Sequence, residues 1–144
     1  MFVPLRIRQE TENMSIQNRS AYHEYYIEET YDAGIVLAGT EVKSIREGKV
    51  SFADSFCFFD KGELWIRNLH IAEYRLGTTN NHLAVHDRKL LLTRRELRKL
   101  EAKIREKGYS LVPLKIFFSE KGLAKMQIGL GKGKKLHDKR ETLR

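Results

Sequence analysis

Apolar and polar residues alternate over about a dozen positions from Tyr25 onward, the longest regular pattern in the chain. Odd positions such as Ile27 and Tyr31 carry apolar side chains, whereas the even positions 24, 28, 30 and 32 carry acids or threonine. A period of two predicts a β-strand, and this one is unusually long. Gly34 lies inside it, where a missing side chain permits a bulge or a sharp coil, as small closed barrels require.

Two polar turns that contain glycine each join β-prone runs, and they predict two hairpins. The first hairpin pairs residues 56–59 with residues 64–71, and the second pairs residues 111–118 with residues 123–131. In the last run, apolar residues at even positions alternate with polar ones. Lys125 is therefore expected on the outer face of its strand.

Two segments have helical patterns. A short helix is predicted over residues 40–47 and is closed by Gly48. A second helix begins at a capping box, in which the Thr93 hydroxyl accepts from the backbone N–H of Glu96 while the Glu96 carboxylate reaches back. The apolar stripe of this second helix consists of Leu97, Leu100 and Ile104.

These elements predict a mainly β fold with two to three helices, arranged as a small OB-type β-barrel that is closed or nearly closed. Residues 1–18 are polar and aperiodic and are expected to form a flexible leader, within which Met14 is a second candidate start. The barrel is expected to span residues 19–131, and a flexible basic tail residues 132–144. Residues 75–87 have the composition of a mobile loop.

Charge narrows the choice of partner. The chain has 144 residues, with 27 Lys and Arg against 19 Asp and Glu, so its net charge is +8. Residues 88–107 hold nine bases and three acids, and residues 132–144 hold six bases and two acids. The excess predicts a polyanionic partner, which is either nucleic acid or an anionic membrane surface.

The location follows from what the sequence lacks. No apolar run approaches the ~18 residues of a membrane span, and residues 1–14 have no signal-peptide core. Cys57 is the single cysteine, so neither an internal disulfide nor a thiolate metal cluster can form. A cytoplasmic protein without membrane contact is expected.

The basic stretch Gly131–Arg140 combines glycines, which let a phosphate approach the backbone, with closely spaced cations. It is not a P-loop, because Lys134 is followed by Lys135 rather than by Ser or Thr. From charge alone, RNA binding and a solubilising tail remain equally open. The basic residues of the second helix have the pattern of a solvated surface.

Catalysis receives little support from the residues. The five histidines are scattered, and His82 and His86 are spaced for a metal only on a helix, whereas their segment has a loop pattern. No metal site, cofactor or enzymatic activity is expected. His23 or His137 with a nearby carboxylate leaves one alternative open, a metal-independent ribonuclease.

Several motifs in order are similar to those of the small protein B (SsrA-binding protein) family. They are YHEYYIEETYDAGI at residues 22–35, GTEVKS at 39–44, DS at 54–55, RKLLL at 88–92, GYSLVPLK at 108–115 and GLGKGKKLHDKRE at 129–141. The resemblance runs from about residue 18 to the end. It implies an OB-type barrel that binds the tRNA-like domain of tmRNA and escorts it to stalled ribosomes for trans-translation. A monomer without catalytic activity is expected.

The resemblance also implies which residues act. The family's tmRNA-binding positions match Asn18, Asp32, Leu91 and Lys125, and the stretch around Glu41 and Lys43 supports the same face. RNA binding extends into the start of the tail at Lys132, Gly133, Lys134 and Lys135. The part of the tail that would contact the small-subunit decoding region of the ribosome matches His137, Asp138, Lys139 and Arg140.

This chain departs from the family in three places. Asp32 stands where the family more often has Glu, and residues 82–87 lack the usual Pro-Leu-Arg-Thr-like run. The chain ends at Arg144, where relatives continue with a charged helical tail, so a truncated chain that binds without rescuing ribosomes is expected. A general ribosomal or translation-factor OB-fold RNA-binding protein is the second interpretation within the binding class.

Overall fold

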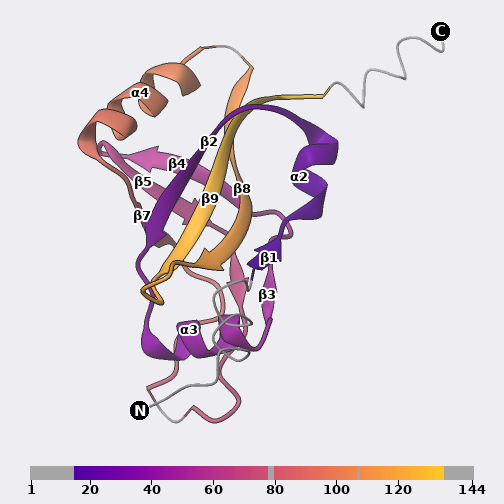
Figure 1. Cartoon of the computed structure of the whole chain (residues 1–144), viewed down its shortest axis with the longest axis vertical. Coiled ribbons are helices and arrows are strands. Elements are labelled where there is room, and N and C mark those ends of the chain that lie inside the picture. The colour runs from indigo at the N-terminus through magenta and orange to yellow at the C-terminus, as the bar shows by residue number, and fades with distance from the viewer. Residues whose placement is uncertain (1–14, 78–79, 107, 135–144) are drawn as a thin grey trace, which may run out of the picture.

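The computed structural model describes residues 15–77, 80–106 and 108–134. Its elements are β1 (Ser15–Gln17), α2 (Arg19–Glu24), β2 (Tyr25–Ile35), α3 (Gly39–Arg46), β3 (Val50–Ser51), β4 (Phe56–Asp60), β5 (Glu63–Arg67), β6 (His70–Ile71), β7 (Arg88–Leu91), α4 (Arg94–Ile104), β8 (Tyr109–Phe118) and β9 (Ala124–Gly133). Seven strands form one antiparallel sheet in the order β1-β8-β9-β2-β7-β5-β4, while β3 and β6 form a two-stranded ribbon. Figure 1 shows α4 and α3 at opposite ends of this sheet.

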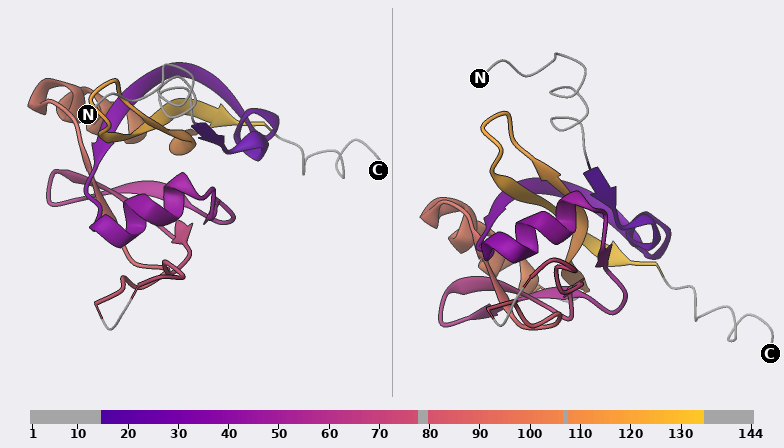
Figure 2. Two further views of the ribbon diagram at one scale, coloured as in Figure 1. Left: turned by 60° about the horizontal axis from the view of Figure 1, so that its bottom comes forward. Right: turned by 90° about the horizontal axis from the view of Figure 1, so that it is seen from below.

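The expected mainly β, OB-type fold with helices is confirmed, but the sheet does not close into a barrel. Figure 2 shows β2 and β9 arching over one side of the molecule while β4 and β5 lie on the other. Within the described residues β1 and β4 are the two edges, and no backbone ladder joins them. Instead β4 comes alongside β8, where residues 56–59 and 109–112 line a groove of about 350 Å³.

The curl of the sheet comes with two shifts in strand register. β2 shifts against β9 between Ile27 and Glu29, and β8 shifts against β9 between Pro113 and Lys115. Proline has no N–H to give to the ladder, so an irregularity there loses no backbone hydrogen bond. Neither shift falls at Gly34, which stays in register with both of its neighbouring strands, so of the bulge or sharp coil predicted there the bulge is absent.

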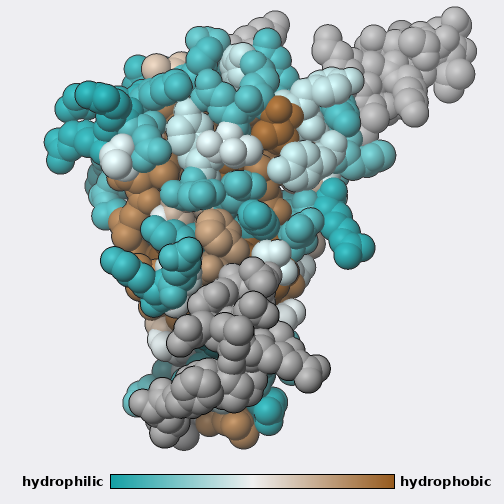
Figure 3. All heavy atoms as spheres, in the orientation of Figure 1, coloured by the Kyte–Doolittle hydropathy of each residue, from teal (hydrophilic) through white to brown (hydrophobic). Residues whose placement is uncertain are grey.

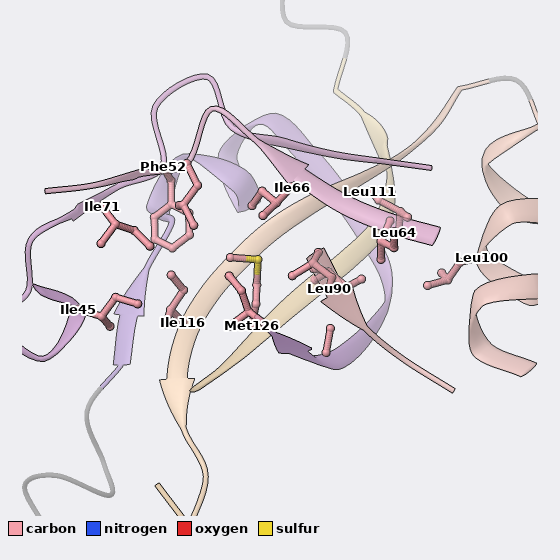
Figure 4. Packing of buried hydrophobic residues seen from close by; sticks show 14 of the residues in the cluster. Ile45, Phe52, Leu64, Ile66, Ile71, Leu90, Leu100, Leu111, Ile116 and Met126 are labelled. Atoms are coloured by element: carbon pink, nitrogen blue, oxygen red, sulfur yellow. The ribbon is translucent and has the colours of Figure 1, made fainter. Parts of the chain in front are cut away.

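The core lies inside the curled sheet (Figure 4), and α3 and α4 lie at its two ends (Figure 1). Ile45 of α3 lies beside Ile71 at one end, and Leu100 of α4 points toward Leu64 at the other. Met126 of β9 lies between them and is fully buried, like these four residues. The two helices thus bury the ends of a core that the sheet alone leaves open.

Both predicted helices are confirmed. The short helix is α3, and Gly48 follows it with a φ of 76°, a conformation that glycine adopts without strain. At the start of α4, the backbone N–H of Glu96 donates to the Thr93 hydroxyl at 3.2 Å. The Glu96 carboxylate accepts from the Thr93 backbone N–H at 3.1 Å, which completes the capping box.

The two predicted hairpins are present as β4–β5 and β8–β9. The first turns at Lys61 and Gly62, whose φ angles of 53° and 79° match the left-handed conformation that tight hairpins favour. The second arm of this hairpin is shorter than expected, because Asn68 adopts a φ of 64° and ends the strand region at β5. Asparagine tolerates that conformation, so the strand ends at this residue although the β-prone pattern of the sequence continues beyond it.

The structure moves both predicted boundaries of the barrel. Residues 15–17 of the expected leader form β1, because β8 offers a free edge and Ile16 packs against the core. At the other end, Lys132 and Gly133 belong to β9 and are not a flexible tail. The backbone N–H of Lys134 donates to the Glu24 carbonyl at 2.7 Å, so the described order continues to residue 134.

The short helix α2 was not foreseen. It buries Ala21 against Val112 and Leu114, on a part of the sheet also covered by Tyr25 and Ile27. Six residues are too few to reveal a helical period, which is why no helix was predicted there. None of the helices in the described part of the chain is long and apolar enough to cross a membrane.

Candidate nucleic-acid interface

Three of the expected RNA-contacting residues meet on the outer face of neighbouring strands. Gly34 of β2 is paired with Leu91 of β7 on one side and with Lys125 of β9 on the other. Asp32 lies two residues before Gly34, so it projects on the same face, while Ala33 between them is buried. Asp32, Leu91 and Lys125 therefore form one surface, which we call the outer site.

Leu91 lies against Gly34 and is half exposed. A Cβ placed on Gly34 would lie 3.4 Å from the Leu91 Cβ, which is an ordinary van der Waals distance. Leu91 exposes 50% of its surface. An exposed leucine therefore lies at the centre of the outer site.

The outer site continues across the sheet through residues that the sequence reasoning did not select. Asp32 accepts a hydrogen bond from the Gln127 amide at 3.3 Å. Gln127 is paired with Lys115 of β8, whose ammonium lies 5.3 Å from the centre of the Phe117 ring. The alternation of β8 places Lys115 on this face, so pairing the two hairpin arms could have revealed it.

Asn18 is placed apart from the other three expected contacts. Its backbone N–H donates to the Leu114 carbonyl at 2.8 Å, and its side-chain amide donates to the Pro113 carbonyl at 2.8 Å. Its amide oxygen accepts from the Ser20 hydroxyl at 3.0 Å. Asn18 thus fixes the junction of β1 and α2 against β8, and β8 and β9 separate it from β2.

Glu41 does not lie on the outer site, because its side chain is 2% exposed. Its carboxylate accepts from the Arg88 guanidinium at 2.5 Å, from His86 at 2.9 Å and from the Ala38 backbone N–H at 2.8 Å. Burial by itself raises the pKa of the Glu41 carboxyl. The hydrogen bonds from Ala38 and Arg88 outweigh burial, so this pKa lies below its ordinary value of 4.5.

Glu41, predicted as an RNA contact, is therefore buried in a network of hydrogen bonds that supports α3. Lys43, which follows it on α3, is exposed, and its ammonium lies 5.4 Å from the centre of the Tyr74 ring. Neither residue is brought to the meeting point of β2, β7 and β9. The pattern of so short a helix could not show that Glu41 is buried while Lys43 is exposed.

Arg88 is a buried residue that the sequence reasoning missed. Besides Glu41, its guanidinium donates to the carbonyls of Leu69 at 2.6 Å and Ala84 at 3.1 Å. His82 joins the same region, with one ring nitrogen 2.9 Å from the Thr40 hydroxyl and the other 2.9 Å from the Ile71 carbonyl. These contacts tie the second half of the expected mobile loop to α3 and β6.

The histidines of this loop are thus engaged in structural hydrogen bonds. Among the described residues, no three His, Cys, Asp or Glu side chains are grouped to hold a metal ion.

The start of the basic tail is built into the fold beside the exposed Tyr26 and the half-buried Tyr109. The Lys132 ammonium lies 4.8 Å from the centre of the Tyr109 ring, and the Lys134 ammonium lies 4.9 Å from that of Tyr26. Lys134 also donates to the Tyr22 carbonyl at 3.0 Å. Four expected tail contacts and one RNA contact lie outside the described residues, namely His137, Asp138, Lys139, Arg140 and Lys135.

The surface offers both polar and apolar contacts. In the view of Figure 3, hydrophilic side chains predominate and smaller apolar areas lie among them. On the outer site an ammonium group can bind phosphate, a carboxylate can accept hydrogen bonds, and a leucine can pack against a sugar or base. This combination suits a folded RNA better than a small molecule.

Comparisons with known proteins agree with one another. A model of a family described as SmpB protein matches residues 15–144. The SsrA-binding protein of Parabacteroides distasonis is 53% identical over 132 residues, covering 92% of this chain and 86% of that protein. The SsrA-binding protein of Geobacillus sp. is 54% identical over 128 residues, covering 89% and 82%.

A solved structure is similar as well. One chain of a structure described as "tmRNA-SmpB: a journey to the center of the bacterial ribosome" matches with a TM-score of 0.73 and 51% sequence identity. The match covers 90% of this chain and 94% of that chain.

Proposed function

This chain belongs to the SmpB protein family, and on that premise we propose that it binds the tRNA-like domain of tmRNA and delivers it to stalled ribosomes for trans-translation. The observation that carries the proposal is the meeting of Asp32, Leu91 and Lys125 around Gly34. Family membership favours this function over that of a general ribosomal OB-fold protein.

Each residue of the outer site has a distinct role in the proposal. Lys125 binds a phosphate of the tRNA-like domain, and Asp32 accepts hydrogen bonds from a ribose hydroxyl or a base edge. Leu91 packs against an exposed sugar or base. Asn18 contributes by holding the β1–α2 junction, and Glu41 and Lys43 act through the support of α3.

The test is the affinity for a tRNA-like-domain fragment of tmRNA at fixed salt. Lys125→Ala and Asp32→Ala are each expected to weaken binding without loss of the fold, because both side chains project from the outer face. Lys49→Ala and Asp60→Ala serve as charge-matched controls, since both residues are exposed and lie outside the outer site. Equal affinities for all four variants would overturn the proposed face.

The basic tail has a separate role in the proposal. Lys132, Gly133, Lys134 and Lys135 extend the RNA contact, while His137, Asp138, Lys139 and Arg140 contact the small-subunit decoding region. A polyanionic rRNA surface suits this segment because it has few apolar side chains to bury elsewhere. His137→Ala is expected to reduce binding of the protein–tmRNA complex to ribosomes while leaving tmRNA affinity unchanged.

The proposal also describes a monomeric cytoplasmic RNA-binding protein without catalytic activity of its own. What supports this is the family assignment, together with the use of His82 and His86 in structural hydrogen bonds. Incubation with labelled tmRNA tests the ribonuclease alternative. Intact RNA is expected, and cleavage abolished by His23→Ala would contradict the proposal.

A further inference from the structure

A groove of about 550 Å³ opens beside the outer site, between α4 and the β4–β5 turn. Its floor is the end of β7, and one wall is the face of α4 that carries Arg94 and Arg98. These two arginines are four residues apart, so they project from the same side of the helix. Figure 1 shows α4 lying above the turn end of β4 and β5, and residues 61–64 at that end line the groove as well.

The groove has an excess of positive charge. Four cations line it, against the two acids Glu63 and Glu101, and Lys89 is ion-paired with Glu63. Among the described residues, no ion pair involves the remaining cations, Lys61, Arg94 and Arg98. The two arginines present guanidinium forks that match phosphate oxygens.

The groove is continuous with the outer site through Leu91. Leu91 lines the groove and is also the strand neighbour of Gly34, so both surfaces share its exposed side chain. An RNA that packs against Leu91 from the outer site and continues over β7 reaches the groove beside α4. The charge of the groove has the sign that this backbone requires.

We propose that this groove binds the phosphate backbone of the same RNA that occupies the outer site, so that the RNA reaches from β2 and β9 across β7 to α4. The inference rests on the proposed function, because it assumes the tRNA-like domain on the outer site. Arg94 and Arg98 contact phosphates from one wall, and Lys61 does so from the turn. The basic face of α4 is then a binding surface rather than a solvated one.

The experiment measures affinity for the tRNA-like-domain fragment over a series of salt concentrations, using the full chain. Arg94→Gln and Arg98→Gln each remove one cation from the groove. Arg95→Gln is the matched control, because it removes the same charge from the same helix but does not line the groove. Thermal unfolding of all variants checks that α4 remains docked.

Each groove variant is expected to lower the slope of log affinity against log salt by about 1, with about a fivefold loss of affinity near 0.15 M salt. Arg95→Gln is expected to change neither by a comparable amount. If all three variants behave alike, the groove makes no specific contact and the inference fails.

Two further arms separate this inference from the proposed function. Failure of the wild-type chain to bind the fragment contradicts the proposed function itself, and unchanged affinity of both Lys125→Ala and Asp32→Ala overturns the outer site. Normal fragment binding by Arg94→Gln and Arg98→Gln combined with weaker ribosome binding would assign the groove to ribosomal RNA, which overturns the inference while leaving the outer site intact.

Discussion

Replacement of Glu41 by alanine is the most informative single change, because it separates a structural role from an RNA contact. The Glu41 carboxylate and the Arg88 guanidinium are 2% and 0% exposed and lie 2.5 Å apart. Glu41→Ala leaves the Arg88 charge buried with only carbonyl partners. Removal of one partner of a buried ion pair costs about 3–5 kcal/mol, a large fraction of the ~5–15 kcal/mol that stabilises a typical domain.

The assay is unfolding by denaturant at neutral pH, with the free energy of unfolding extrapolated to water. Glu47→Ala is the control, since Glu47 is an acid at the end of the same helix and its ion-pair partner, Arg75, is 62% exposed. An exposed pair contributes about 0–1 kcal/mol. Equal losses for Glu41→Ala and Glu47→Ala would refute the structural assignment of Glu41.

The pH dependence gives a second readout through Glu41→Gln. The folded pKa of Glu41 is lowered below 4.5, so its contribution to stability is fully present above that pH and is lost as the pH falls through the folded pKa. Glu41→Gln should therefore flatten the acid limb of the stability curve. The folded Glu41→Gln protein should bind the tmRNA fragment like wild type, and weaker binding would restore Glu41 as an RNA contact.

Three other predictions concern local features. Thr93→Ala should lower the free energy of unfolding by about 1 kcal/mol through loss of the α4 cap, whereas Thr93→Ser keeps the hydroxyl and most of the stability; denaturant midpoints compare them. Gly131→Ala should cost about 1–3 kcal/mol, because its Cβ would overlap the Tyr26 carbonyl, whereas Gly133→Ala, with its nearest neighbour at 3.8 Å, should unfold near the wild-type midpoint. Burial raises the pKa of the Cys57 thiol to about 12, so a disulfide reagent at pH 8 should label it slowly in the native protein and rapidly after unfolding; rapid native labelling would contradict this.

Family resemblance supplied residues for the outer site that periodicity could not have selected together. Alternation placed Asp32 and Lys125 on exposed strand faces, but it could not show that the two residues lie close together. Their neighbourhood depends on the pairing of β2 with β9 and β7, segments that are far apart in the sequence. Lys115 was missed for the same reason, and the burial of Glu41 was not foreseen because a two-turn helix does not reveal which side faces the core.

By itself, the sequence determined the features that depend on neighbouring residues. The long alternation of β2, the turn at Lys61 and Gly62, and the capping box at Thr93 each arise from contacts within a few positions, so local pattern was sufficient. Tertiary structure alone decided the open edge between β4 and β8, the ordering of residues 15–17 and 132–134, and the burial of Arg88 against Glu41. Each of these depends on the free energy of contacts between distant segments, which no local pattern encodes.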